Sequence, residues 1–394
     1  MDDGAELSVR SAKLQGFPPF PTWNGTVAAP LWDDRGLLSV LGADGELVVL
    51  QSSQRKDDEH ATNDSCLRVR KVLPSAGEKV ASFCQCWSSD GSVVAVAHDR
   101  RVVFYSGEDF RVLARMRLRY NVGSMDITKR RYRSTVDGDD RLEFLLIVGT
   151  AFGGLLYKVE LQSERGGDGE QTLAHVARVH DEVAVCSVKF SGDGCNAAMG
   201  TMDGRLFVRR LDTQEDEELS TFGSTVMSKV LIAPRVTSMS FSACSTKLVV
   251  ATRKGNVYVF IRASETGEWQ TLSSCKDLSA NPKPKASGAA GVSKSATAAQ
   301  TLVACWGPVF VVCSRAVTSR LEMYDFASGC LLHSLQLAPV AASSTTLNTW
   351  VDQQLVTGIC VLQTADGSSR LMCHDTSTNL VLVEWPFLDA MNER

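Results

Sequence analysis

The sequence predicts an all-β protein in which seven similar four-stranded antiparallel sheets close into one ring. Three observations predict it: a strand pattern that repeats at constant spacing, turn dipeptides of the Asp-Gly type inside the repeats, and apolar residues at alternate strand positions. Each sheet of such a ring buries its faces against its neighbours, so the repeats cannot fold singly. One large domain is therefore expected, although a chain of 394 residues would otherwise suggest two or three.

The repeat is clearest in two segments, which run over residues 183–208 and 236–260. Phe190 of the first segment and Phe241 of the second are 51 residues apart, and so are Asp203 and Lys254. Equal offsets at two landmarks indicate that the segments share one register, which chance similarity rarely gives.

Each repeat has the pattern of a strand, a polar turn, an apolar strand, a tight turn and a third strand. The tight turn of the first segment is Asp203-Gly204, where glycine can adopt the positive φ that a two-residue hairpin requires. Leu206 and Val208 then occupy alternate positions, as in a strand with one buried face. A fourth strand after a variable loop completes the sheet.

The same template gives five further repeats. Trp32–Gly36 opens the first and Trp87–Gly91 opens the second, and the closing glycines of these motifs are 55 residues apart. The third, sixth and seventh repeats run through residues 122–157, 301–325 and 355–375. The ring is therefore expected to occupy residues 26–394 and to follow an N-terminal arm, residues 1–25.

Two stretches of the ring do not follow from the repeat. The outer strand of the last sheet has two candidates, Leu7–Leu14 and Asn379–Trp385, and we expect the second because Leu380–Val383 is more apolar. Between repeats five and six, residues 279–300 are rich in Ser, Ala, Gly and Lys and contain no aromatic residue. That composition predicts a disordered loop.

These repeats resemble the WD40-repeat family of β-propellers. The resemblance is carried by Phe190–Gly194 followed by Asp203–Val208. It implies a propeller fold in which a histidine and a turn aspartate pack between blades. It also implies aromatic residues where the family has tryptophan-aspartate, although Arg209-Arg210 stands there in the fourth repeat. The residues to which the resemblance gives such structural roles are His180, Asp203, Tyr105, Phe260, Tyr324 and Asp325.

Composition and charge exclude several classes of protein. The chain is 44% hydrophobic with a net charge of −4, which excludes a disordered chain and a globally basic nucleic-acid binder. The start lacks a secretory signal pattern, and the longest apolar uncharged run, residues 302–313, is shorter than the ~20 residues of a membrane span. We therefore expect a cytoplasmic or nuclear protein without membrane insertion, whose twelve cysteines are reduced.

The sequence carries no signature of catalysis or of a cofactor. It contains neither a phosphate-binding glycine loop nor a Gly-x-Ser-x-Gly nucleophile motif, and its six histidines lack zinc-site spacing. Cys84 and Cys86 would project from one side of a strand, and no further metal ligands accompany them in the sequence. We expect buried thiols there, and we predict no catalytic residue, metal or cofactor.

The WD40 resemblance implies a non-enzymatic scaffold that holds other proteins in a multi-subunit complex. Loops, and residues just before the first strand of each blade, would carry the contacts. The residues that we expect to bind partners are Trp32, Arg205, Arg235 and Arg253. Phe17, Phe20 and Trp23, in a segment with three prolines, are either further partner anchors or an arm that packs on the propeller.

Two alternative functions remain at this point. The first is a propeller that binds nucleic acid through a basic loop at residues 129–133, where Arg130 and Arg131 would contact phosphates. The second is a hydrolase or a regulatory, exchange-factor propeller, which would need a compact polar cluster in the central channel.

Overall fold

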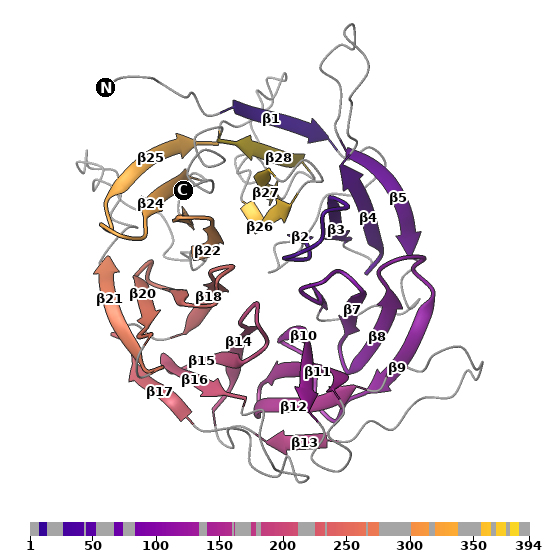
Figure 1. Ribbon diagram of the computed structural model, residues 1–394. Coiled ribbons are helices and arrows are strands. Elements are labelled where there is room, and N and C mark those ends of the chain that lie inside the picture. Colours follow the sequence, from indigo (N-terminus) through magenta and orange to yellow (C-terminus); the bar gives the residue numbers. More distant parts are fainter. Residues whose placement is uncertain are drawn as a thin grey trace, which may run out of the picture.

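The computed structural model describes residues 8–13, 27–42, 45–52, 67–73, 83–133, 140–159, 161, 175–178, 183–211, 225–232, 235–264, 267–275, 301–314, 320–337, 356–363, 368–375 and 379–385. Within these ranges the strands form seven four-stranded antiparallel sheets, arranged as blades around a central axis (Figure 1). None of the described residues forms a helix. The predicted seven-bladed β-propeller is confirmed.

In six of the blades, consecutive strands follow one another from the channel outward. Blades 1 and 2 contain β2 (Val27–Ala28), β3 (Leu37–Leu41), β4 (Leu47–Ser52), β5 (Leu67–Leu73), β6 (Phe83–Trp87), β7 (Val93–His98), β8 (Arg101–Ser106) and β9 (Val112–Arg117). Blades 3 and 4 contain β10 (Ser124–Arg133), β11 (Asp140–Thr150), β12 (Gly153–Val159), β13 (His175–Arg178), β14 (Val185–Phe190), β15 (Asn196–Thr201), β16 (Arg205–Arg210) and β17 (Thr225–Val230). Blades 5 and 6 contain β18 (Val236–Phe241), β19 (Lys247–Thr252), β20 (Val257–Arg262), β21 (Trp269–Cys275), β22 (Thr301–Trp306), β23 (Val309–Ser314), β24 (Arg320–Asp325) and β25 (Leu331–Gln336).

The seventh blade is assembled from both ends of the chain. From the channel outward it contains β26 (Val356–Gln363), β27 (Ser369–Asp375), β28 (Asn379–Glu384) and β1 (Ser8–Lys13). In Figure 1 the indigo β1 lies outside the yellow β28, and the two pair antiparallel from Ser8↔Glu384 to Lys13↔Asn379. The expectation that Leu380–Val383 forms the outermost strand is wrong, because these residues pair with β27 on one side and β1 on the other. The stretch expected to be an N-terminal arm, residues 1–25, thus contains the strand that closes the ring.

The tight turns inside the blades adopt the geometry that the dipeptides predict. Gly204, between β15 and β16, has a φ of 88°, and Gly255, between β19 and β20, has a φ of 84°. Such values favour glycine because a side chain would meet the backbone. The Asp-Gly and Lys-Gly dipeptides therefore set the hairpins of blades 4 and 5.

The core consists of apolar layers between neighbouring blades. Between blades 2 and 3, for example, Phe104 and Met116 belong to one buried cluster with Ile127 and Leu146. Between blades 6 and 7 the ring centroids of Trp306 and Trp385 are 6.5 Å apart. Because each layer requires two blades, stability depends on a complete ring.

The aromatic residues at the ends of third strands lie in these layers. Phe260 and Tyr324 are buried, and Tyr105 is half-buried against the layer between blades 1 and 2. The Tyr324 ring stacks on Phe310 at a centroid distance of 5.2 Å. Asp325 instead shapes a turn, where its carboxylate accepts hydrogen bonds from Ser328 N–H at 2.7 Å and Ser328 O–H at 2.6 Å.

We predict that Gly200→Ala destabilises the layer between blades 4 and 5. A Cβ at Gly200 would lie 2.4 Å from the Cβ of Val236, which is closer than atoms can approach. Overpacking of this kind costs about 2 kcal/mol, and urea unfolding would measure the lost free energy. Gly123→Ala is the matched control, because its nearest neighbour would be Gly149 O at 3.5 Å. Equal urea midpoints for the two variants would contradict the prediction.

The basic segment at residues 129–133 is not a loop. It forms the end of β10, a strand of ten residues that pairs along its whole length with β11. Lys129 forms an ion pair with Asp90 of blade 2 at 2.7 Å, and the buried Arg130 pairs with Glu143. The expectation of a solvated basic loop is therefore wrong, because the segment is part of a strand. The carboxylates of Asp90 and Glu143 pair with Lys129 and Arg130, so these two side chains can lie between blades and within a blade.

Candidate functional site

The ring has two faces that carry different connections. In an antiparallel blade the turn between the second and third strands lies on the same face as the connection to the next blade. Backbone hydrogen bonds join these segments: Val122 N–H donates to Asp99 O at 2.7 Å, and Arg253 N–H donates to Arg235 O at 3.0 Å. We call this face the connector face.

Three of the sequence-predicted partner residues meet on the connector face. Arg205 begins β16 and Arg253 lies in the turn between β19 and β20, while Arg235 immediately precedes β18. The backbones around them are joined, since Arg205 pairs in register with Val230 of β17 and Leu231 N–H donates to Gly204 O at 2.9 Å. The sequence therefore predicted residues that share one edge of the propeller.

Exposed apolar side chains accompany these arginines. Val230, the last residue of the outer strand β17, is 78% exposed, and Ile232, in the connection between blades 4 and 5, is 71% exposed. Met202, in the turn between β15 and β16, is 46% exposed. We call this set the blade 4–5 rim: Met202, Arg205, Val230, Ile232, Arg235 and Arg253.

Sequence reasoning missed the apolar members of the rim. Val230 and Ile232 read as ordinary strand and connector residues, because valine and isoleucine are usually buried. The available signal was their position just before the first strand of the next blade. Contiguous exposed apolar residues beside charged ones are typical of a protein interaction site.

The backbone of the rim is held in a defined conformation. Thr201 O–H donates to the Asp203 carboxylate at 2.5 Å, and Arg205 N–H donates to Thr201 Oγ1 at 2.8 Å. The Asp203 carboxylate also lies 3.0 Å from Arg205 Nε in an exposed ion pair. Arg235 adopts a φ of 61°, a left-handed conformation that a non-glycine residue adopts at a cost in free energy.

The other predicted partner residues do not join this rim. Trp32 lies between β2 and β3 on the opposite face, where it is 54% exposed and its backbone N–H donates to Ser89 O at 2.7 Å. Arg130 is buried in its ion pair with Glu143, which Lys158 also approaches at 3.2 Å. The remaining predicted partner residues lie outside what the structure describes: Phe17, Phe20, Trp23 and the side chain of Arg131. The same holds for His180, which was expected to pack between blades, and for the expected loop at residues 279–300.

The innermost strands of all seven blades line a central channel with a cavity of about 300 Å³. Its main charged pair is Lys189 with Asp126, whose Nζ and Oδ1 atoms are 3.2 Å apart. Asp126 Oδ2 also accepts a hydrogen bond from Phe190 N–H at 2.8 Å, while burial raises the pKa of this carboxyl. Asp126 is therefore held by a cation from the adjacent blade, with Lys189 42% exposed toward the channel.

Channel thiols are poor nucleophiles and poor metal ligands. Burial raises the pKa of Cys84, Cys305 and Cys360 to about 12, so these thiols stay protonated at neutral pH. Cys84 and Cys86 are both buried against blade 3, as expected. Within the described ranges, no three His, Cys, Asp or Glu side chains gather closely enough to hold a metal ion.

The comparisons with known proteins identify a fold. The chain matches no protein-family model and no curated protein. It is similar to a solved structure, the β-propeller domain of Cps50 (Swd1) from Myceliophteria thermophila, with a TM-score of 0.59 and 10% sequence identity. That similarity covers 95% of this chain and 99% of the other. The shared fold is the seven-bladed β-propeller.

Within its described residues the propeller presents exposed apolar side chains at its surface. Its channel charges compensate each other, and its most exposed apolar side chains lie at the rim. The described segments include no helix long and apolar enough to cross a bilayer.

Proposed function

We propose that this chain is a non-enzymatic, WD40-like interaction scaffold, a subunit of a multi-protein complex that contacts a partner through the blade 4–5 rim. The observation that carries the proposal is the exposure of Val230 and Ile232 at 78% and 71% beside three arginines. Apolar area of this kind is stabilised when a partner removes it from water, and arginine is enriched where partners dock.

The fold supports the same conclusion. A rigid ring presents loops of variable length at fixed positions, which suits simultaneous contacts with several proteins. The similar solved structure is described only as a β-propeller domain, so the role of a complex subunit is our inference. The ten cysteines whose side chains the structure describes are free thiols, which supports a cytoplasmic or nuclear location.

The two alternative functions have less support. A nucleic-acid interface at residues 129–133 would lose Arg130, whose guanidinium is already paired with Glu143, and Lys129, which is paired with Asp90. An enzyme or exchange factor acting through the channel would have to use Asp126 and Lys189, which are paired with each other.

We predict that Val230→Ser combined with Ile232→Ser reduces partner recovery about tenfold, because it removes the apolar centre of the interface. The measurement is affinity purification of the tagged full chain from cells at moderate salt, with quantitative mass spectrometry of the copurifying proteins. Thermal unfolding should be nearly unchanged, because both side chains are exposed.

The matched control is Leu331→Ser combined with Leu332→Ser on β25. These side chains are 47% and 42% exposed, but they lie on the outer strand of blade 6, away from the rim. Recovery of the wild-type chain alone, or equal partner recovery by the rim variant and the wild type, would refute the proposed interface.

A further inference from the structure

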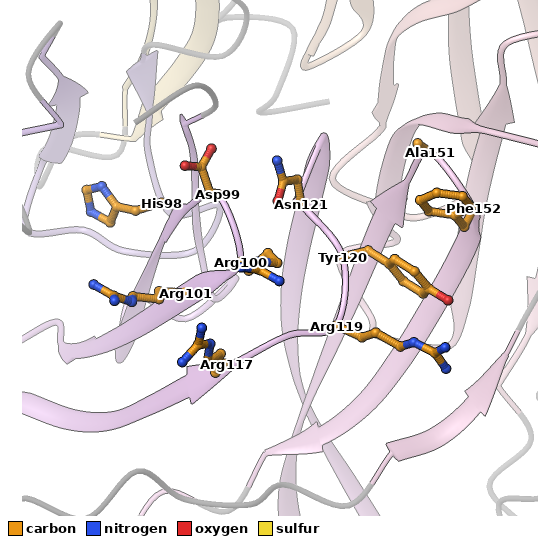
Figure 2. Close-up of a pocket in the computed structure, with 10 residues that line it drawn as sticks. All are labelled: His98, Asp99, Arg100, Arg101, Arg117, Arg119, Tyr120, Asn121, Ala151 and Phe152. Atoms are coloured by element: carbon orange, nitrogen blue, oxygen red, sulfur yellow. The ribbon is translucent and has the colours of Figure 1, made fainter. Parts of the chain in front are cut away.

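A second surface on the connector face gathers arginines. A pocket of about 610 Å³ lies between blades 2 and 3 and is lined in part by the turn that joins β7 to β8. Figure 2 shows four arginines along it, with one acidic residue, Asp99, at its edge. Arg100 lies in that turn, Arg101 and Arg117 lie on β8 and β9, and Arg119 lies in the connection to blade 3.

The strand register places two of these charges side by side. Arg101 of β8 is the direct cross-strand partner of Arg117 of β9. Like charges at directly opposite positions destabilise a sheet. Among the residues that the structure describes, no carboxylate lies within ion-pairing distance of Arg100, Arg117 or Arg119. The pocket therefore holds a positive charge that an anion would stabilise.

The pocket also has an aromatic wall. The rings of Tyr120 and Phe152 are 4.6 Å apart with an interplanar angle of 35°, and Phe152 is 56% exposed. The Arg119 guanidinium lies 5.3 Å from the centroid of the Tyr120 ring, which orients it at the base of this wall. An apolar side chain could therefore pack on the wall while neighbouring anionic groups reach the arginines.

The arginines are spread out rather than aimed at one point. In Figure 2, Arg101 and Arg117 lie on the blade 2 side, whereas Arg119 lies on the blade 3 side below Tyr120. A single phosphate is bound best by groups that converge on it, but separated guanidiniums match several carboxylates along an extended chain.

We propose that this pocket binds an acidic segment of a partner protein, with glutamate or aspartate side chains on the arginines and an apolar side chain on the Tyr120–Phe152 wall. The inference rests on the proposed scaffold function in taking the ligand to be a protein, but it uses residues outside the blade 4–5 rim. A nucleic-acid strand is less well matched, because the basic residues of β10 that could extend the track, Lys129 and Arg130, are engaged by Asp90 and Glu143.

The test is direct binding to the full chain by fluorescence anisotropy. The probe is a fluorescein-labelled peptide in which a phenylalanine is followed by a run of glutamates, and its counterpart has glutamine in place of glutamate. We expect the acidic peptide to bind about tenfold more tightly than its counterpart and to weaken as salt rises. Equal affinity for both peptides, or tighter binding of an oligothymidylate or a phosphoserine peptide, would overturn the proposal.

Matched variants locate the binding site. Arg117→Gln combined with Arg119→Gln should weaken binding of the acidic peptide about tenfold. Arg111→Gln is the control, because Arg111 immediately precedes the same strand β9 and pairs instead with Asp109 at 3.5 Å. Unchanged binding by the double variant would overturn the proposal, whereas the rim variant Val230→Ser/Ile232→Ser should bind the peptide normally. A negative result in the peptide-binding test of this pocket would therefore not contradict the interface proposed at the blade 4–5 rim.

A stability measurement separates lost binding from lost folding. Arg117→Gln removes the like-charge pair with Arg101, so we expect its Tm to rise by roughly 1 °C at low ionic strength and the difference to shrink in salt. Arg117→Gln alone should also bind the acidic peptide more weakly, and weaker binding by a more stable protein cannot result from misfolding. A lower Tm at low ionic strength would contradict the electrostatic basis of the pocket.

Discussion

Deletion of residues 1–13 is expected to destabilise the propeller by roughly 5 kcal/mol and to make it aggregate. The deleted stretch contains β1, which pairs with β28 at six consecutive positions and so completes blade 7. Each backbone hydrogen bond of such a ladder contributes about 1 kcal/mol, and the deletion removes the whole ladder at once. It also leaves β28 as an edge strand with unpaired backbone groups, which is a template for pairing with another chain.

The measurement is thermal unfolding together with size-exclusion chromatography of the purified protein. Deletion of residues 1–7 alone is the matched control, because it leaves every paired residue of β1 in place. The control should unfold near the wild-type temperature and elute as the wild type does. An equal Tm for the longer deletion and the control would mean that β1 does not hold the ring closed.

The blades could be predicted from sequence because the information that specifies them is local. In blades 4 and 5 the turn glycines Gly204 and Gly255 require positive φ, and the apolar alternation in the flanking strands fixes which face is buried. These signals recur with constant spacing, so they also predict that neighbouring units pack in the same way.

Ring closure could not be predicted by comparing the apolar character of the two candidate strands. Residues 380–383 are apolar because β28 is covered by strands on both sides, which is the property of an interior strand. The outermost strand β1 has the polar sequence Ser8–Lys13, as suits an edge. The more apolar candidate, Asn379–Trp385, therefore contains the third strand of the blade. The other candidate, Leu7–Leu14, contains the outermost strand.

The sites were only partly predictable for a similar reason. The turn positions of Arg205 and Arg253 follow from the repeat, so their common face could be inferred. The exposure of Ile232 and the Arg101–Arg117 pairing depend instead on three-dimensional neighbours and strand register, which one sequence does not contain. Arg130 was misassigned because its buried partner, Glu143, is on the next strand.

The propeller is expected to lose about 3 kcal/mol of stability through His374 alone as the pH falls from 6.5 toward 4. His374 of β27 is fully buried, with Nδ1 2.8 Å from Thr357 Oγ1, and burial lowers the pKa of its imidazole to about 4. The unfolded chain binds a proton near pH 6.5, whereas the folded chain stays neutral until about pH 4. Stability therefore falls with acidification across that window, because the unfolded state takes up the proton first.

The measurement is the free energy of urea unfolding at several pH values between 4 and 7, for the wild type and for His374→Gln. The variant lacks the titrating group, so its stability should vary less steeply with pH, whatever its absolute stability at neutral pH. Burial also lowers the pKa of His98 and raises that of Asp126, but both groups are present in the two proteins, so the difference in slope isolates His374. Parallel pH profiles would show that His374 titrates normally in the fold, and the buried contact with Thr357 would then need another explanation.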